Sequence, residues 1–259
     1  MYNLYDYLFF FLIYSFLGWC AEVCFCSINT GKFVNRGFLN GPLCPIYGFG
    51  MVALIFFLTP VKDNLLILFI ASFFLTSILE GLTGYFMKKL FHTVWWDYSD
   101  QPFNIGGYVC LSFSLMWAVG GSVMMLFVHP TIAWLLSLIN HSVGTIFLWI
   151  ALTVFVADCV ITVATIAKLN KDLELLNMMA AQLEQGSQAL AMRLGNSAIR
   201  NDKKFNRQKD DMLEHFEELK ARFINSRSIL RSRLIKAFPN MKHEKFNDWL
   251  EELKKRYYK

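Results

Sequence analysis

Three carboxylic acids lie inside stretches of the sequence that are otherwise apolar: Glu22, Glu80 and Asp158. An ionisable group at membrane depth is costly and normally faces a bundle interior or water. Such acids can transfer protons as general acids or bases, or line a path for a polar solute. The alternative is that Glu22 and Glu80 lie near the membrane interface and pair with basic residues of the adjoining loops.

A second candidate for chemistry is the stretch 35–48, NRGFLNGPLCPIYG, which lies between two apolar segments. Its three glycines and two prolines prevent a continuous helix. Apolar side chains alternate with these turn residues, so the stretch is predicted to be packed rather than solvated. Irregular backbone at membrane depth occurs only where protein buries it or where it lines a cavity. We therefore expect a folded plug or a cavity wall.

A third polar stretch, 92–104 (HTVWWDYSDQPFN), is expected to face this plug. Asp97 follows two tryptophans and loses water if they insert, so it needs a partner, and Arg36 is the expected one. The tryptophans alone would also fit an interfacial aromatic belt. His92 fits a structural or interfacial histidine better than a catalytic one.

These stretches define one candidate polar cavity. Its predicted members are the charged and hydrogen-bonding residues of the two loops and of the segments beside them: Glu22, Asn35, Arg36, Glu80, His92, Asp97, Tyr98 and Asn104. We expect Arg36 to form a hydrogen-bonded cluster with at least one of Glu22, Glu80 and Asp97, because the guanidinium cannot be neutralised. No catalytic, cofactor-binding or metal-binding residue is assigned. The six cysteines form no CxxC pair and are interpreted as small buried hydrophobes.

The elements that must position these residues are apolar helices. The chain has 259 residues, of which 55% are hydrophobic and 16% aromatic, which indicates a membrane protein. The apolar runs predict an all-α polytopic bundle of about five transmembrane helices, near residues 8–28, 46–59, 65–87, 107–127 and 143–167. The run 132–140 is too short to cross and is predicted to be an interfacial or re-entrant helix.

The charge distribution divides the chain into a transmembrane domain, residues 1–167, and a basic cytoplasmic helical tail, residues 168–259. With the tail in the cytoplasm, five spans place the N-terminus outside. Lys32 and Arg36 then lie inside with Lys88 and Lys89, whereas the outer loops carry only Lys62. This arrangement follows the positive-inside rule.

The tail is predicted to contain a helix continuous with the last span. Its leucines, from Leu169 to Leu194, alternate four and three residues apart and form a heptad seam typical of a coiled coil. In one interpretation the tail is a helical hairpin that packs on itself. In the other, the seam serves self-association or the docking of a soluble partner. The basic residues Arg227, Arg231, Arg233 and Lys236 are candidates for contact with anionic membrane lipid. Nucleic acid is not an expected partner, because acidic residues are interleaved and no binding motif is present.

Several motifs together resemble a known family. They are Gly18-Trp19 with Glu22, the stretch NRGFLNGPLCPIYG, Glu80, WWDYS at 95–99, and Phe103-Asn104 with Cys110-Leu111. Over about residues 8–127 the chain is similar to bacterial inner-membrane proteins described as putative ABC-transporter permeases, type IV. The resemblance implies a transport role in the bacterial inner (plasma) membrane. Because the sequence has no GxxxxGK[ST] nucleotide loop, the ATPase would be a separate subunit.

The leading hypothesis is therefore a permease-like component with a polar cavity that faces the cytoplasm. One alternative is a membrane scaffold or sensor that acts through its coiled tail. The other is a membrane-embedded enzyme that uses Glu22, Glu80, His92 or Asp97 as acid or base, which the sequence favours less. The sequence specifies no substrate, transport direction or cofactor.

Overall fold

The computed structural model describes residues 2–194, 203–225 and 228–257, and this part of the chain is mostly helical. The helices are α1 (Leu4–Thr30), α2 (Pro45–Leu58), α3 (Leu65–Phe91), α4 (Leu111–Val123), α5 (His129–Ser137), α6 (His141–Leu194), α7 (Lys203–Asn225), α8 (Ile229–Ala237) and α9 (Asn247–Tyr257). A 3₁₀ turn, η1 (Thr59–Val61), follows α2, and a π-helical turn, η2 (Met124–Val128), joins α4 to α5. Two short strands, β1 (Thr93–Val94) and β2 (Lys242–His243), pair with each other.

Four helices of the described chain are long and apolar enough to cross a membrane: α1, α3, the run Leu111–Ser137, and α6 up to Gln185. These agree with four of the five predicted spans. The remaining predicted span corresponds to a shorter apolar helix, Pro45–Val61. Seventeen residues give a helix about 25 Å long, slightly less than a hydrocarbon core of about 30 Å.

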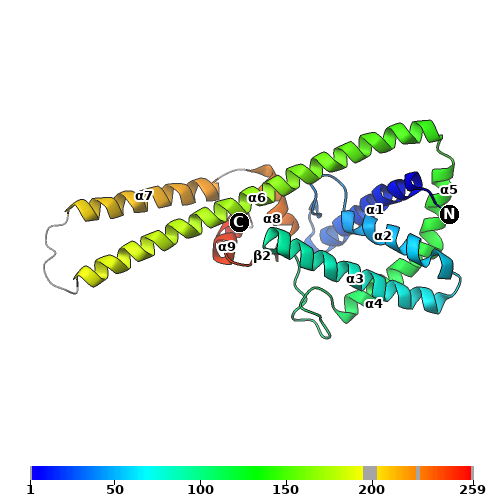
Figure 1. Cartoon of the computed structure of the whole chain (residues 1–259), viewed down its shortest axis with the longest axis horizontal. Helices are drawn as coiled ribbons and strands as arrows, with labels where there is room; N and C mark the ends of the chain where they lie inside the picture. The colour runs from blue at the N-terminus through cyan, green and yellow to red at the C-terminus, as the bar shows by residue number, and fades with distance from the viewer. Residues whose placement is uncertain (1, 195–202, 226–227, 258–259) are drawn as a thin grey trace.

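One predicted boundary is wrong. The sequence predicts a fourth span near residues 107–127 and a separate short helix at 132–140, but the chain remains helical from Leu111 to Ser137. Pro130 lies in the first turn of α5, directly after the π-helical turn. Proline lacks an N–H group, and a change in hydrogen-bond spacing before it lets the helix continue. In Figure 1, α5 lies at the end of the bundle that is remote from α7 and leads into α6.

The membrane bundle is built on the close pair α1 and α2, which run antiparallel. Gly48 of α2 lies against the Phe11 carbonyl group and Ser15 of α1. Near the other end of the pair, the rings of Tyr7 and Phe56 are 6.1 Å apart. Buried aromatic and aliphatic residues of α1, α2, α3 and η2 fill the space between these helices, including Phe10, Tyr14, Leu54, Leu68 and Met125. Burial of this apolar surface holds the bundle together.

A second core joins the tail to the C-terminal half of α6. Leu169, Leu173 and Leu176 are buried there against residues of α7, α8 and α9, among them Phe216 and Leu253. The predicted continuity of α6 with the tail helix is confirmed. The described part of the leucine seam is covered by helices of the same chain, as in the hairpin alternative. The seam positions Ser187, Leu190 and Leu194 lie outside the residues whose side chains are described.

In Figure 1, α7 runs alongside α6, and the two project together away from the membrane bundle. The helices α8 and α9 sit where this hairpin meets the bundle. There β1, which follows α3, pairs antiparallel with β2, with Thr93 opposite His243 and Val94 opposite Lys242. The tail is thus joined by backbone hydrogen bonds to the loop between α3 and α4.

The contact between α1 and α2 generates the first prediction. A Cβ atom added at Gly48 would lie 2.5 Å from the Phe11 carbonyl oxygen, so Gly48→Ala forces the helices apart. Overpacking of this kind costs about 1–3 kcal/mol, and we expect a lower apparent Tm in detergent. Gly50, in the same helix, has no atom within 4 Å of such a Cβ. Gly50→Ala is therefore the matched control, and it should leave Tm unchanged or raise it. An equal loss in both variants would contradict this packing.

Candidate functional site

The loop between α1 and α2 is fixed to α6 through Asp158. One carboxylate oxygen of Asp158 accepts hydrogen bonds from the Asn40 backbone N–H at 3.1 Å and from the Asn40 side-chain amide at 2.9 Å. The other accepts from the Gly41 N–H at 2.7 Å. A Cβ atom at Gly41 would lie 3.1 Å from this oxygen, so glycine permits the close approach. The Asn40 amide also donates to the Thr162 hydroxyl at 2.9 Å.

The same loop is fixed to α1 through Asn35. The indole N–H of Trp19 donates to the Asn35 side-chain oxygen at 2.7 Å, and the Asn35 amide donates to the Asn40 carbonyl at 2.8 Å. Asn35 therefore connects α1 to Asn40, the residue that binds Asp158. Its side chain has a structural role in the loop.

The predicted ion pair of Arg36 is present with Glu22. The Arg36 Nε atom lies 3.0 Å from Glu22 Oε2, and the two side chains are 34% and 25% exposed. The Tyr47 hydroxyl donates to the other Glu22 oxygen at 2.6 Å. The pair is therefore half-buried, and Glu22 is satisfied by one cation and one phenol. Beside it, burial raises the pKa of the Cys44 thiol to about 12, with the Glu22 charge adding to the shift.

From the tail, Arg233 reaches the same loop. Its guanidinium donates to the carbonyl groups of Gly37 and Phe38, both at 2.9 Å. The prediction that Arg233 rests on lipid is therefore wrong. The same holds for Arg231, which is only 4% exposed and donates to the Phe223 carbonyl at 2.7 Å. Burial in the docked tail lowers the Arg233 pKa, yet an arginine remains charged.

Glu80 occupies a neighbouring place between α3 and α4. The residue is 8% exposed, and its Oε1 accepts a hydrogen bond from the Tyr98 hydroxyl at 3.2 Å. The ring of Tyr98 stacks on Phe113 of α4 at 4.7 Å. Trp117 of α4 faces the Glu80 carboxyl group and also contacts Tyr47 edge to face at 5.5 Å. Glu22 and Glu80 are thus linked through the aromatic residues Tyr47 and Trp117.

Asp97 does not join this group, and its predicted pairing with Arg36 is wrong. Its carboxylate lies 3.0 Å from Lys242 Nζ and accepts hydrogen bonds from the Ser99 backbone and hydroxyl. These Ser99 bonds, followed by Lys242, lower the Asp97 pKa to about 2. The pairing of β1 with β2 brings Lys242 from the tail, and this long-range contact decides the partner of Asp97.

His92 and Asn104 have structural places. His92 ends α3 in the left-handed conformation, with φ of 52°, and its exposed ring lies 3.4 Å from Glu244. Asn104 donates to the carbonyl groups of Ser99 and Gln101 and accepts from the Gly107 N–H. The eight predicted residues therefore form separate groups and not one continuous cluster. Glu22 lies with Arg36, Glu80 with Tyr98, and the others hold the loops.

Sequence reasoning missed the anchors of the plug loop. Asp158 was recognised as an acid at membrane depth, but its partners, Asn40 and Gly41, lie almost 120 residues away. Arg233 lies in a charged tail with no local sign of burial.

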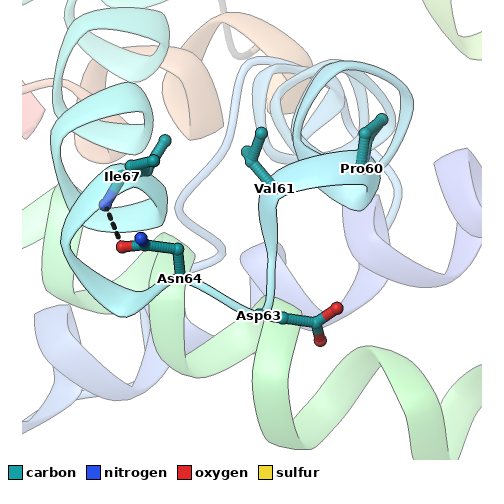
Figure 2. Close-up of a pocket in the computed structure, with 5 residues that line it drawn as sticks. All are labelled: Pro60, Val61, Asp63, Asn64 and Ile67. Atoms are coloured by element: carbon teal, nitrogen blue, oxygen red, sulfur yellow. Dashed lines mark hydrogen bonds between the residues drawn. The ribbon is translucent and has the colours of Figure 1, made fainter.

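Neither a metal centre nor a disulfide appears in the described residues: none of their His, Cys, Asp and Glu side chains form a group of three that could hold a metal ion, and all six cysteines are free. A shallow hollow of about 360 Å³ lies at the opposite end of the bundle, lined by Pro60, Val61, Asp63, Asn64 and Ile67. Figure 2 shows that its polar Asn64 caps α3 by accepting from the Ile67 N–H. The Asp63 side chain points away from Asn64.

A family model described as "Putative ABC-transporter type IV" matches residues 9–163, which is more than half of the chain. The match includes the plug loop, Glu22, Glu80 and Asp158, and ends before the tail. No curated protein and no solved structure matches the chain.

The Arg36–Glu22 pair generates the second prediction. Arg36→Ala leaves Glu22 in a half-buried site without its cation. Because the pair is neither fully exposed nor fully buried, we expect the free energy of unfolding to fall by about 1–3 kcal/mol. The apparent Tm should fall by at least about 2 °C. Lys32, in the same loop, is exposed and forms no ion pair within the described chain, so Lys32→Ala is the control. Equal tolerance of the two changes would refute a structural role for the pair.

Proposed function

Because the chain belongs to the putative ABC-transporter type IV family, we propose that it is the membrane-embedded subunit of an ATP-driven transporter. Its sequence contains no GxxxxGK[ST] loop for nucleotide phosphates. The ATPase is therefore a separate subunit that acts on this chain from the cytoplasm. The substrate travels along a polar path beside Glu22 and Glu80.

The proposed topology has five crossings, with the N-terminus outside and the tail in the cytoplasm. The end of the bundle with Tyr5 and His141, whose rings stack at 4.5 Å, also holds the contact of Tyr14 with His129. At the other end the plug loop and β1 both contact the tail. The basic residues of the loops gather at this second end, which supports a cytoplasmic location. On this topology α2 crosses the membrane, with its length completed by the packed plug.

The observation that carries the proposal is the attachment of the plug loop to both α6 and α8. Asp158 of α6 holds the backbone of Asn40 and Gly41, and Arg233 of α8 holds the carbonyl groups of Gly37 and Phe38. A displacement of α8 by an ATPase would therefore move the plug loop, which contacts Glu22 through Arg36. This is a direct mechanical connection between a cytoplasmic partner and the proposed path.

Five crossings are few for a transporter, so we propose that two copies assemble. The described leucines of the tail seam pack within one chain and leave little of that seam for a second copy. Apolar residues of α6 that are exposed within the membrane segment, such as Val154 and Ile161, offer another surface. Membrane lipid covers the remaining apolar faces.

The scaffold is the second candidate function. It is favoured by the length of α6, which at 54 residues spans about 80 Å. With α7 it forms a hairpin that projects from the bundle (Figure 1) and offers a surface for a soluble partner. The enzyme alternative has less support, because Glu22 is ion-paired and His92 lies on the surface.

The topology is the third prediction. We expect the single cysteine of the Lys62→Cys variant to react with an impermeant maleimide in intact cells. Lys32→Cys and Lys89→Cys should react only after permeabilisation. All three native side chains are exposed, and the native cysteines are replaced in the parent protein. Labelling of positions 32 and 62 from the same side would overturn the crossing by α2.

The ATPase partner is the fourth prediction. The full chain, purified in mild detergent from its own host, should co-elute with a subunit that carries a GxxxxGK[ST] loop and hydrolyses ATP. Arg233→Ala should retain this subunit yet change its ATPase rate by about fivefold or more, because the contact with the plug loop is lost. Arg222→Ala is the control, since Arg222 is exposed on α7 and pairs only within its helix. A chain that purifies without any ATPase would favour the scaffold.

A further inference from the structure

The Glu80 carboxyl group is unusual among the acids of the bundle. It lies in α3, is 8% exposed, and its Oε1 accepts a hydrogen bond from the neutral Tyr98 hydroxyl. The Trp117 indole is a second neutral donor to the carboxyl group. The other oxygen, Oε2, is buried and has no hydrogen-bond partner among the described residues. An ionised carboxylate left in this state is strongly penalised.

Two cations of the adjoining elements pair with other acids. Arg36 pairs with Glu22 at 3.0 Å. Lys88, eight residues further along α3, lies about 12 Å away along the helix axis, and its Nζ is 3.4 Å from Glu244. Among the described residues no cation pairs with Glu80, whereas Glu22 has Arg36 and Asp97 has Lys242.

We propose that Glu80 is a proton-binding site: its carboxyl group takes up a proton on Oε2 near neutral pH and releases it when the surroundings change. The proposal does not depend on the transport role, because it concerns the charge state of one side chain. In a transporter it would supply an exchangeable proton beside the polar path.

A proton fits this site better than a metal cation. Calcium takes six to eight oxygen ligands, and magnesium requires an octahedral set. Around Glu80 the described neighbours are the aromatic rings of Tyr98 and Trp117, and no group of three potential metal ligands includes it. A protonated carboxyl group needs no such shell.

The groups that face Glu80 from the adjoining elements also permit a neutral acid. Tyr98 comes from the loop and Trp117 from α4; beyond Trp117 lies Tyr47 of α2. Burial raises the Tyr98 pKa, with the Glu22 charge adding to the shift, so the phenol keeps its proton. The contact of α6 with α3 lies near Phe91, where Asn170 donates to the Phe91 carbonyl, about three turns from Glu80.

The test uses the full chain in lipid vesicles and dicyclohexylcarbodiimide, an apolar carbodiimide that reacts with protonated carboxyl groups. We expect an adduct on Glu80 at about pH 7, identified by mass spectrometry, which declines as the pH is raised above the range where a buried carboxyl ionises. Glu22, paired with Arg36, should remain unlabelled in the same molecules. Tyr98→Phe removes a donor that favours the anion, so the pH of half-labelling should rise by about one unit.

A second measurement does not depend on access of the reagent. The infrared spectrum at about pH 7 should contain the carbonyl band of a protonated carboxyl group, and Glu80→Gln should remove it. Loss of this band in Glu80→Gln confirms the proposal even if the carbodiimide cannot enter. A band that is the same in Glu80→Gln, or is absent from the parent protein, would overturn it.

Discussion

The hydrogen bonds of Asp158 to the backbone of Asn40 and Gly41 are the constraint on which the rest of the structure depends. The plug loop interrupts helical structure, so its backbone groups need partners other than their own turn. Asp158 supplies acceptors for two N–H groups, and Arg233 supplies donors for two carbonyl groups. The hydrogen-bonding groups of the loop backbone are thereby paired with an acidic residue from α6 and a basic residue from α8. Removal of either residue exposes polar backbone to an apolar environment, which costs more than the hydrogen bonds themselves.

This arrangement also makes the tail part of the membrane domain. Arg233, the β1–β2 pairing and the Lys242–Asp97 ion pair all cross between the tail and the loops that join the membrane helices. Apolar contacts add to them, since Trp95 packs edge to face on both Phe38 and Phe238. Hydrogen bonds, an ion pair and apolar contacts therefore cross the boundary in composition at residue 168. A force on the tail would reach α6 through its continuous helix and α1 through the plug loop.

Local patterns in the sequence were sufficient for the helices and for the nature of the plug loop. Apolar length predicted α1, α3 and α6, and Gly and Pro predicted the irregular stretch 35–48. The sequence predicted that Arg36 would pair with one of Glu22, Glu80 and Asp97, and the structure shows Glu22. The partner of Asp97 could not be predicted, because Lys242 reaches it only when β2 docks on β1. The span predicted at 107–127 continues further because Pro130 lies in the first turn of a helix, which the sequence does not distinguish from a proline that terminates one.

The two acids near the aromatic residues Tyr47 and Trp117 illustrate how one bundle can hold different charge states. Glu22 has a guanidinium at 3.0 Å and a phenol at 2.6 Å. Glu80 is more deeply buried, has a phenol at 3.2 Å and the Trp117 indole beside it, and forms no ion pair among the described residues. Because a buried carboxylate without a counter-charge is penalised, the surroundings of Glu80 favour a neutral acid in a way that the surroundings of Glu22 do not.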